Sequence, residues 1–392
     1  MSNLPKGWKD LKLGDICNFY LGLTYTPTYV DKGIPFLSVK DLKNNQISFE
    51  NTKYISEEEF ENSTSNAKPQ KGDIVFGRVG TLGNPVIVDF DIPFCIFVSL
   101  GFIRVHDNIF NEFIKHWISS DYFMNQVDSQ VSGSAQKNLN VGWLKNFKLF
   151  LPPLEEQKKI ADILSTVDKK IAFVEENINA TEELKKGLMQ KLLTEGIGHT
   201  EFKDSELGRI PESWEVDTFN NLSIEIIDGD RGINYPKQNE FSDTGYCLFL
   251  SAKNVTKRGF EFIEKQFITE DKDSLLRKGK LQKKDIVLTT RGTVGNIAYF
   301  NDLISFENMR INSGMVLLRS SKLNTDYLYK VMNSYIIQNH ISNVAFGSAQ
   351  PQLTVKEIKT FKIPVPPLEE QKQIAEILST VDNKLENLKE KK

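Results

Sequence analysis

The stretch LPPLEEQKKIADILSTVD at residues 151–168 returns as VPPLEEQKQIAEILSTVD at residues 365–382. The two copies are identical at 15 of 18 positions and lie 214 residues apart. Two prolines followed by two glutamates favour the first turn of a helix, where a missing N–H does no harm and the helix dipole favours negative charge. The repeat therefore predicts that two similar helices begin at equivalent places in the chain.

Apolar residues follow each start at the spacing of a coiled-coil seam. In the first copy the stripe consists of Ile160, Leu164, Val167, Ile171, Val174 and Ile178, and in the second copy of Ile374, Leu378, Val381, Leu385 and Leu388. The first stripe predicts a helix over residues 154–193, which is roughly 60 Å long at about 1.5 Å per residue. Each stripe needs a partner, and we expect it to be the other stripe or a helix of another protein. The alternative is that each helix packs on its own domain.

The repetition extends upstream of the helix motif. Four further pairs of segments match: GSAQKNLNV (133–141) with GSAQPQLTV (347–355), DIVFGRVGTLGN (73–84) with DIVLTTRGTVGN (285–296), FLSVKDL (36–42) with FLSAKNV (249–255), and LPKGW (4–8) with IPESW (210–214). We therefore expect a domain at residues 1–150, a spacer helix at 151–198, a second domain at 199–364 and a second spacer helix at 365–392. Between the matching segments the copies differ, which is typical of one scaffold that presents two different surfaces.

Composition agrees with two ordinary domains, because 392 residues with 40% hydrophobic and 26% charged residues exceed one compact core. No run approaches the roughly 20 apolar residues of a membrane span, and the first residues lack a signal region, so we expect the cytoplasm. Cys17, Cys95 and Cys247 are widely spaced, which favours reduced, buried thiols. A net charge of −3 argues against a chain that coats nucleic acid without specificity.

Each domain is expected to be α+β. Short β-branched runs precede Gly-rich turns at residues 77–83 and 292–295, and amphipathic segments at 111–127 and 325–341 predict helices. The order of these elements is not a series of βαβ units. Catalytic motifs are absent from the sequence: there is no GxxxxGK[ST] loop, no HExxH and no Asn-Pro-Pro-aromatic segment, and the glycines of residues 77–83 suit a turn better than a nucleotide loop. We therefore expect neither an enzyme nor a metal site.

The order of these motifs resembles the specificity subunit of type I restriction-modification systems. The resemblance covers essentially the whole chain and rests on IPESWEV, GSAQxxLxV, PPLEEQ followed by ILSTVD, and GLMQKLLTEG at the end of the long helix. It implies two target recognition domains that each read one half of a bipartite site on double-stranded DNA. It also implies an antiparallel coiled coil of the two helices, which sets the separation of the two domains. Half-sites about one helical turn apart, roughly 34 Å or 10 base pairs between centres, would place both domains on one side of the duplex. The second helix reaches only Lys392, the counterpart of Ile178, so we expect the pair to be short or partly unpaired.

The resemblance further implies partners. Two modification (methyltransferase) subunits would dock on the helices and carry S-adenosylmethionine, and restriction (translocase and endonuclease) subunits with ATP and Mg would join them. The specificity chain itself would bind no cofactor and catalyse nothing. The runner-up hypothesis is a duplicated protein-bridging scaffold that does not contact DNA, and a third is a self-contained methyltransferase or nuclease.

Candidate DNA contacts come from polar residues in the shared turns and loops. They are Arg78, Thr81, Asn84, Arg291, Thr293, Asn296, Lys40, Lys253, Gln136, Lys137 and Gln350. Arginine in a Gly-rich turn reaches phosphates or guanine edges, whereas a solvated turn is the alternative. The threonines and asparagines have turn capping as their alternative role. Residues that choose bases are expected where the copies disagree, as at residues 24–32 and 228–237.

Overall fold

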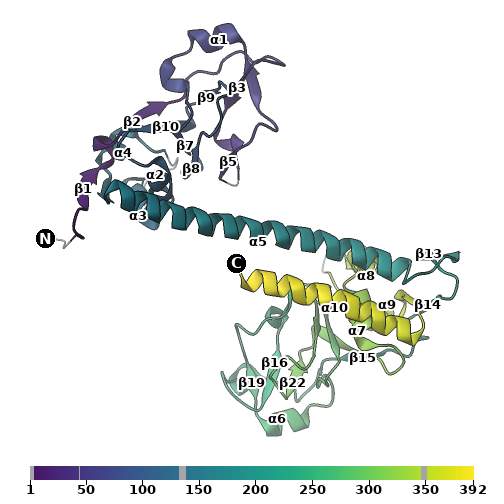
Figure 1. Cartoon of the computed structure of the whole chain (residues 1–392). Helices are drawn as coiled ribbons and strands as arrows, with labels where there is room; N and C mark the ends of the chain where they lie inside the picture. Colours follow the sequence, from purple (N-terminus) through teal and green to yellow (C-terminus); the bar gives the residue numbers. More distant parts are fainter. Residues whose placement is uncertain (1–3, 44, 132–137, 346–350) are drawn as a thin grey trace. The chain divides into compact units, whose positions relative to one another are not determined.

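The computed structural model describes residues 4–43, 45–131, 138–345 and 351–392 (Figure 1). The chain divides into two compact units, unit 1 at Met1–Ala172 and unit 2 at Phe173–Lys392. The boundary falls inside a single long helix, and each unit contains both helices and antiparallel strands. This content agrees with the predicted α+β class.

The described elements of unit 1, with the helix that leaves it, run in the following order. The strands are β1 Lys9–Lys12, β2 Cys17–Leu21, β3 Ile34–Leu37, β4 Leu42–Lys43, β5 Gln46–Ile47, β6 Lys53–Ile55, β7 Ile74–Gly77, β8 Gly83–Ile87, β9 Cys95–Ile96, β10 Leu100–Val105 and β11 Lys148–Leu151. The α-helices are α1 Glu57–Asn62, α2 Asn111–Ile118, α3 Asp121–Val131, α4 Val141–Asn146 and α5 Leu154–Thr194, and the 3₁₀ helices are η1 Leu13–Asp15, η2 Val39–Asp41 and η3 Ser65–Ala67.

Unit 2 repeats this order of strands and α-helices after an additional hairpin, β12–β13. Its strands are β12 Phe202–Ser205, β13 Gly208–Pro211, β14 Glu215–Thr218, β15 Glu225–Asp228, β16 Cys247–Leu250, β17 Val255–Thr256, β18 Gly259–Phe260, β19 Phe267–Ile268, β20 Ile286–Thr289, β21 Ile297–Tyr299, β22 Met309–Ile311, β23 Met315–Arg319 and β24 Lys362–Val365. Its helices are α6 Glu270–Leu275, α7 Thr325–Met332, α8 Tyr335–Ala345, α9 Val355–Lys359 and α10 Leu368–Glu390, with η4 Gln238–Glu240 and η5 Ala252–Asn254.

Strand pairing is the same in both units. A four-stranded antiparallel sheet has the order β2-β10-β7-β8 in unit 1 and β15-β23-β20-β21 in unit 2. A three-stranded sheet has the order β6-β3-β9 in one and β19-β16-β22 in the other, with one parallel pair in each. The small pairs β1-β11 and β14-β24 also correspond. The duplication in the sequence is therefore a duplication of topology.

Alternating side chains bury both faces of the four-stranded sheet. In β7, Ile74 and Phe76 join the core that contains α2 and α3, whereas Val75 joins the core shared with the three-stranded sheet. In β20, Ile286 and Val287 divide between two cores in the same way. This alternation follows from the period of two in a strand. The four-stranded sheet of each unit is thus packed on both faces.

The two amphipathic segments predicted as single helices are each broken in two. Between α2 and α3, the Ser120 hydroxyl accepts a hydrogen bond from the N–H of Phe123 at 3.3 Å, as an N-cap does. Between α7 and α8, the hydroxyl of Ser334 donates to the carbonyl oxygen of Val331 at 2.6 Å. Serine competes for backbone hydrogen bonds and so ends one helix and starts the next.

The PPLEEQ motif lies where a strand turns into a helix. β11 ends at Leu151 and α5 begins at Leu154, with the two prolines between them. The second glutamate accepts a hydrogen bond from a tryptophan of the upstream motif, with Trp8 Nε1 at 3.1 Å from Glu156 Oε2 and Trp214 Nε1 at 2.9 Å from Glu370 Oε2. The upstream tryptophan motif and the PPLEEQ motif, which are far apart in the sequence, therefore meet at the start of the helix in each unit.

The glutamine of the same motif ties the helix start to the domain. Gln157 is buried, donates to the carbonyl oxygen of Pro152 at 2.9 Å and accepts from the N–H of Phe110 at 3.0 Å. Gln371 makes the equivalent bonds to Pro366 and Asn324. A buried amide with both ends bonded tolerates few substitutes, which is the physical reason for its repetition.

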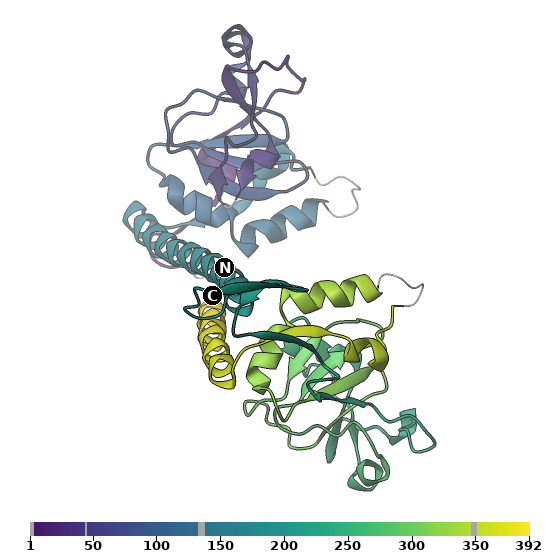
Figure 2. The ribbon, with the colours of Figure 1, turned by 90° about the vertical axis from the view of Figure 1, so that its right-hand side faces the viewer.

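Within unit 2, α10 lies along the C-terminal part of α5 (Figures 1 and 2). Three ion pairs join the two helices: Lys392 with Glu175 at 3.0 Å, Lys389 with Glu182 at 2.8 Å, and Lys185 with Asp382 at 2.6 Å. The residue number rises on one helix as it falls on the other, so the pair is antiparallel. Buried leucines and isoleucines of both helices enter the core of unit 2: Leu192, Leu193, Ile374 and Leu378.

The predicted pairing of the two stripes is displaced along α5. Leu164, Val167 and Ile171 are 40%, 46% and 39% exposed, whereas Ile178 is 9% exposed and Leu192 is 7% exposed. α10 therefore covers the later part of α5, where the heptad pattern loosens. The alternative of packing on the parent domain holds for the start of each helix: Ile160 packs on the core of unit 1, and Ile374 belongs to the core of unit 2. No helix within the described residues is long and apolar enough to cross a bilayer.

Candidate nucleic-acid interface

The Gly-rich turn joins β7 to β8 in unit 1 and β20 to β21 in unit 2. Its backbone is held in the same way in both units, because the N–H of Leu139 donates to the carbonyl oxygen of Arg78 at 2.9 Å and that of Leu353 to Thr290 at 3.0 Å. Arg78 therefore corresponds to Thr290. Arg291 lies one residue later and corresponds to Val79. The two arginines predicted as DNA contacts therefore occupy different positions in the two turns.

Arg78 points into unit 1. The residue is 9% exposed, and its guanidinium donates from Nε to Leu139 O at 2.9 Å, from Nη1 to Val98 O at 3.0 Å and from Nη2 to Asn138 Oδ1 at 3.1 Å. Burial lowers the pKa of this guanidinium below its ordinary value. This geometry does not fit the predicted DNA contact, because every guanidinium nitrogen already bonds to the protein. The side chain instead stabilises the backbone at Val98 and the segment at Asn138 and Leu139.

Arg291 points outward. Its residue is exposed, and its backbone pairs with Gln352 in an antiparallel bridge. In the parts of the chain that the structure describes, no acceptor bonds to its guanidinium. The guanidinium of Arg291 is thus available to a ligand, and its predicted DNA contact stays a prediction, whereas the guanidinium of Arg78 is bonded within unit 1.

A polar hollow of about 290 Å³ opens beside Arg291 in unit 2. Its lining consists of Asp228, Arg231, Thr290, Arg291, Gln352, Leu353, Thr354, Val355 and Lys356. The Nη2 atom of Arg231 lies 3.5 Å from Oδ1 of Asp228, and it also donates a hydrogen bond to the carbonyl oxygen of Ser313 at 3.2 Å. Three cationic side chains and one carboxylate leave an excess of positive charge. This is the chemistry of an anion site.

The asparagines of the turns hold the turn to the neighbouring segment. Asn84 Nδ2 lies 3.4 Å from the carbonyl oxygen of Leu42, and Asn296 Nδ2 donates to that of Val255 at 2.9 Å. Asn84 adopts a φ of 50°, a left-handed conformation that asparagine tolerates. Both asparagines therefore have structural contacts beyond the turn itself. Their neighbours Thr81 and Thr293 are exposed.

The remaining predicted DNA contacts differ in whether the side chain is exposed, paired or outside the described residues. Lys40 is exposed at η2, and Lys253 is exposed at η5 but pairs with Glu264 at 2.7 Å. Gln136, Lys137 and Gln350 lie outside the described residues. The DNA-contact predictions for Lys40, Thr81 and Thr293 stay open, because each side chain reaches solvent.

Two cations of the hollow were missing from the predicted set. Arg231 falls inside the segment 228–237, where the copies disagree, and Lys356 follows the second GSAQ motif. Comparing the two copies could have identified Lys356, because unit 1 has Gly142 at the equivalent position and the positive charge is therefore specific to unit 2. Their convergence with Arg291 is a tertiary feature, because the three residues come from two loops and helix α9.

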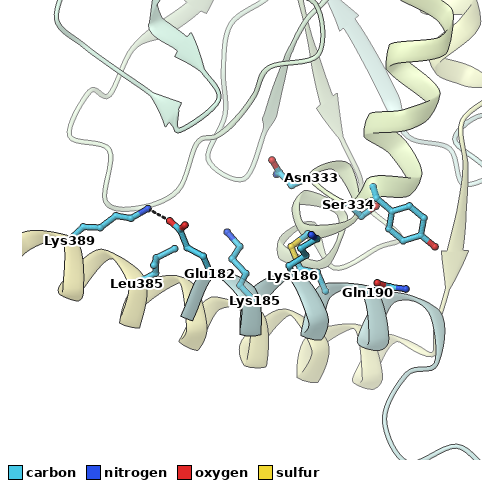
Figure 3. Close-up of a pocket in the computed structure, with 10 residues that line it drawn as sticks. Glu182, Lys185, Lys186, Gln190, Asn333, Ser334, Leu385 and Lys389 are labelled. Atoms are coloured by element: carbon cyan, nitrogen blue, oxygen red, sulfur yellow. Dashed lines mark ion pairs between the residues drawn. The ribbon is translucent and has the colours of Figure 1, made fainter. Parts of the chain in front are cut away.

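A second hollow, of about 570 Å³, lies beside the helix pair of unit 2 (Figure 3). It is lined by Glu182, Lys185, Lys186, Met189, Gln190, Asn333, Ser334, Tyr335, Leu385 and Lys389. Figure 3 shows side chains from α5, α10 and the α7–α8 turn gathered around it, with the Lys389–Glu182 ion pair at one side. The surface combines apolar side chains with lysines, which suits a protein partner better than a small polar substrate.

The three cysteines are buried and free, as predicted. Burial raises the pKa of Cys17 and Cys247 to about 12, so neither thiol supplies a nucleophile at neutral pH. Among the described residues, no group of three or more His, Cys, Asp or Glu side chains is placed to hold a metal ion.

Comparisons with known proteins agree with this architecture. The model of the type I restriction modification DNA specificity domain matches residues 5–183 and 212–392. The MjaVIII specificity subunit of a type I restriction enzyme from Methanocaldococcus jannaschii is 34% identical over 66% of this chain and 61% of its own length. The MjaX specificity subunit from the same organism, described as putative, is 28% identical over 98% of this chain and 89% of its own.

The fold also has a counterpart among solved structures. The crystal structure of a type I restriction-modification S subunit from M. genitalium matches with a TM-score of 0.62 at 16% identity, over 100% of this chain and 93% of that one. At this identity the match shows the fold. Because the family model covers both repeats, the chain belongs to the family of type I restriction modification DNA specificity domains and carries two copies of that domain.

Proposed function

We propose that this chain is the DNA-specificity subunit of a type I restriction-modification complex, in which each unit reads one half of a bipartite site on double-stranded DNA. The observation that carries the proposal is the division of labour between shared and differing residues. Shared residues such as Trp8, Glu156 and Gln157 hold the scaffold, whereas Arg231, Arg291 and Lys356 on the loops of unit 2 differ from unit 1. One scaffold with two different loop surfaces suits the recognition of two different half-sites.

The helices are proposed to dock two modification subunits. The stripe on the first part of α5 supports this, because Leu164, Val167 and Ile171 are exposed. The hollow beside the helix pair supplies further apolar surface ringed by lysines. A complex with modification and restriction subunits would cover such surfaces.

Catalysis and cofactors are proposed to reside on the partner subunits. S-adenosylmethionine, ATP and Mg would bind there, and this chain would act in the cytoplasm as a recognition subunit without chemistry of its own. The buried, high-pKa thiols of Cys17 and Cys247 support this proposal, because they leave these residues without nucleophilic function.

The test begins with the DNA site. Mapping methylated adenines in host DNA identifies the bipartite target, and fluorescence anisotropy then measures binding of a labelled duplex by the chain with its modification subunits. We expect binding that is lost when either half-site is scrambled and when the spacer is lengthened by one base pair. Each scrambled half-site serves as the matched control for the other.

Two outcomes would contradict the proposal. Absence of binding to any duplex, with the modification subunits present and bound to the chain, would favour a protein-bridging scaffold. Binding of S-adenosylmethionine by the isolated chain would favour a self-contained methyltransferase.

A further inference from the structure

The hollow of unit 2 presents three cations to solvent, two from loops and one from a short helix. Arg231 follows β15, Arg291 lies in the β20–β21 turn, and Lys356 lies in α9. Arg231 is partly neutralised by Asp228, at 3.5 Å. Within the described part of the chain, no acceptor bonds to the side chain of Arg291 or Lys356, and both residues are exposed. Two unneutralised cations beside one small hollow repel each other unless an anion lies between them.

Unit 1 has the same scaffold without these charges. Gly22 and Gly229 occupy equivalent places, since their N–H groups donate to Leu100 and Met315 in the equivalent strands β10 and β23. Counting from these glycines, Thr24 stands where unit 2 has Arg231. Val79 stands in place of Arg291, and Gly142 in place of Lys356. The arginine that unit 1 does have in this turn is Arg78, whose guanidinium bonds to Leu139, Val98 and Asn138.

We propose that the hollow formed by Arg231, Arg291 and Lys356 binds a backbone phosphate of the second DNA half-site, and that the described residues of unit 1 form no equivalent phosphate site. The inference rests on the proposed function, since it names how unit 2 holds the DNA whose bases it reads. A phosphate is favoured over a base edge because a phosphate carries the negative charge that an excess of cations requires, whereas base edges are neutral donors and acceptors. The two domains therefore contribute unequally to the salt-dependent part of the affinity.

The first experiment measures salt dependence. The full complex binds its own site at several salt concentrations, and the slope of log affinity against log salt is compared for the wild type and for Arg291→Gln and Lys356→Gln. Each neutralised phosphate contributes about 0.9 to the magnitude of this slope, so we expect the double variant Arg291→Gln/Lys356→Gln to lower it by about 1, and each single variant to weaken binding roughly tenfold at fixed salt. Val79→Gln in unit 1 is the matched control and leaves the slope unchanged, whereas Val79→Arg raises it.

The second experiment locates the phosphate. Single phosphates of the second half-site are replaced by uncharged methylphosphonate, and one linkage is expected to weaken binding by the wild type but not by Arg291→Gln. This non-additivity identifies the contacting pair. Inorganic phosphate is titrated separately, and saturable binding of it at micromolar concentration by the isolated chain would replace the DNA contact with a small-anion site.

The outcomes separate this inference from the proposed function. If the wild-type complex binds no DNA, the proposed function fails. If it binds its site while Arg291→Gln and Lys356→Gln keep the wild-type affinity and slope, the phosphate site alone fails. Loss of discrimination at one base pair, with an unchanged slope, would make Arg291 a base contact and overturn the phosphate assignment. Circular dichroism of each variant verifies that the fold is intact.

Discussion

Lys330 donates a hydrogen bond from Nζ to Asp382 Oδ2 at 2.6 Å, and this pair joins α7 to α10 in unit 2. The Lys330 side chain is only 9% exposed. The equivalent residues in unit 1 are His116 and Asp168, with 3.7 Å between His116 Nδ1 and Asp168 Oδ2. The same junction between domain and helix is thus a short, buried ion pair in one unit and a longer His–Asp contact in the other, where the histidine carries charge only when it is protonated.

Asp382→Asn should destabilise the helix pair of unit 2. Asp382 also forms an ion pair with Lys185 at 2.6 Å, and the substitution leaves the buried Lys330 without its anion, which costs about 3 kcal/mol. Hydrogen exchange of α10 measures the effect locally. Asp168→Asn is the matched control and should cost less than about 1 kcal/mol, because the Asp168 side chain is 53% exposed. Equal protection loss in the two variants would contradict the structural difference between the units.

The stability of unit 1 should depend on His116 in mildly acidic solution. Burial lowers the pKa of His116 despite the attraction of Asp168. As the pH falls below about 6.5, the unfolded chain binds a proton before the folded chain does, so the free energy of unfolding decreases until the folded pKa is passed. His116→Asn removes this part of the pH dependence. The protection of α2 against hydrogen exchange, corrected for intrinsic rates, is measured at pH 7.5 and pH 5 in the wild type and in His116→Asn. An identical change in protection between the two pH values in both proteins would refute the prediction.

Glu370→Ala should loosen the turn at the end of α5. Glu370 Oε1 accepts from the N–H of Ile197 at 2.9 Å and from His199 Nε2 at 2.8 Å, and Oε2 accepts from Trp214. Losing three bonds to one carboxylate should cost about 3 kcal/mol, whereas Glu156→Ala should cost about 1 kcal/mol.

Trp214 reports the Glu370 change because it is completely buried. Its fluorescence during urea unfolding should shift to lower urea in Glu370→Ala and remain unchanged in Glu156→Ala, which lies in unit 1. An unshifted midpoint in Glu370→Ala would show that the carboxylate does not hold the turn.

Arg78→Ala should destabilise unit 1, and Arg291→Ala should leave the stability of unit 2 unchanged. Removing the guanidinium of Arg78 leaves Val98 O, Leu139 O and Asn138 Oδ1 without their donor, at a cost of about 3 kcal/mol. Arg78→Lys should not restore stability, because lysine lacks the planar fork. Hydrogen exchange of β7 and β10 gives the readout for Arg78, and that of β20 and β23 for Arg291. A stable Arg78→Ala protein would return this residue to the candidate DNA contacts.

The sequence by itself determined the parts of this protein that depend on local pattern or on repetition. The repeated PPLEEQ motif located both helix starts, because prolines and glutamates suit a first turn wherever they occur. The duplication predicted two units with one topology, and apolar surroundings predicted the burial of Cys17, Cys95 and Cys247. The breaks at Ser119–Ser120 and at Asn333–Ser334 were not predicted, because the amphipathic pattern continues across both pairs of residues.

Only the tertiary structure decided which surfaces meet. A periodic stripe shows that one face of a helix is apolar, but not which distant segment covers it, so the pairing of α10 with the later part of α5 could not be inferred from spacing. The contacts of Arg78 and Arg291 were equally hidden, since a difference of one position between equivalent turns separates a guanidinium that bonds within unit 1 from one that lines the hollow of unit 2. The cationic hollow arises because Arg231 and Lys356, distant in sequence, meet Arg291 through the packing of two loops and helix α9, and such convergence is a long-range property of the fold.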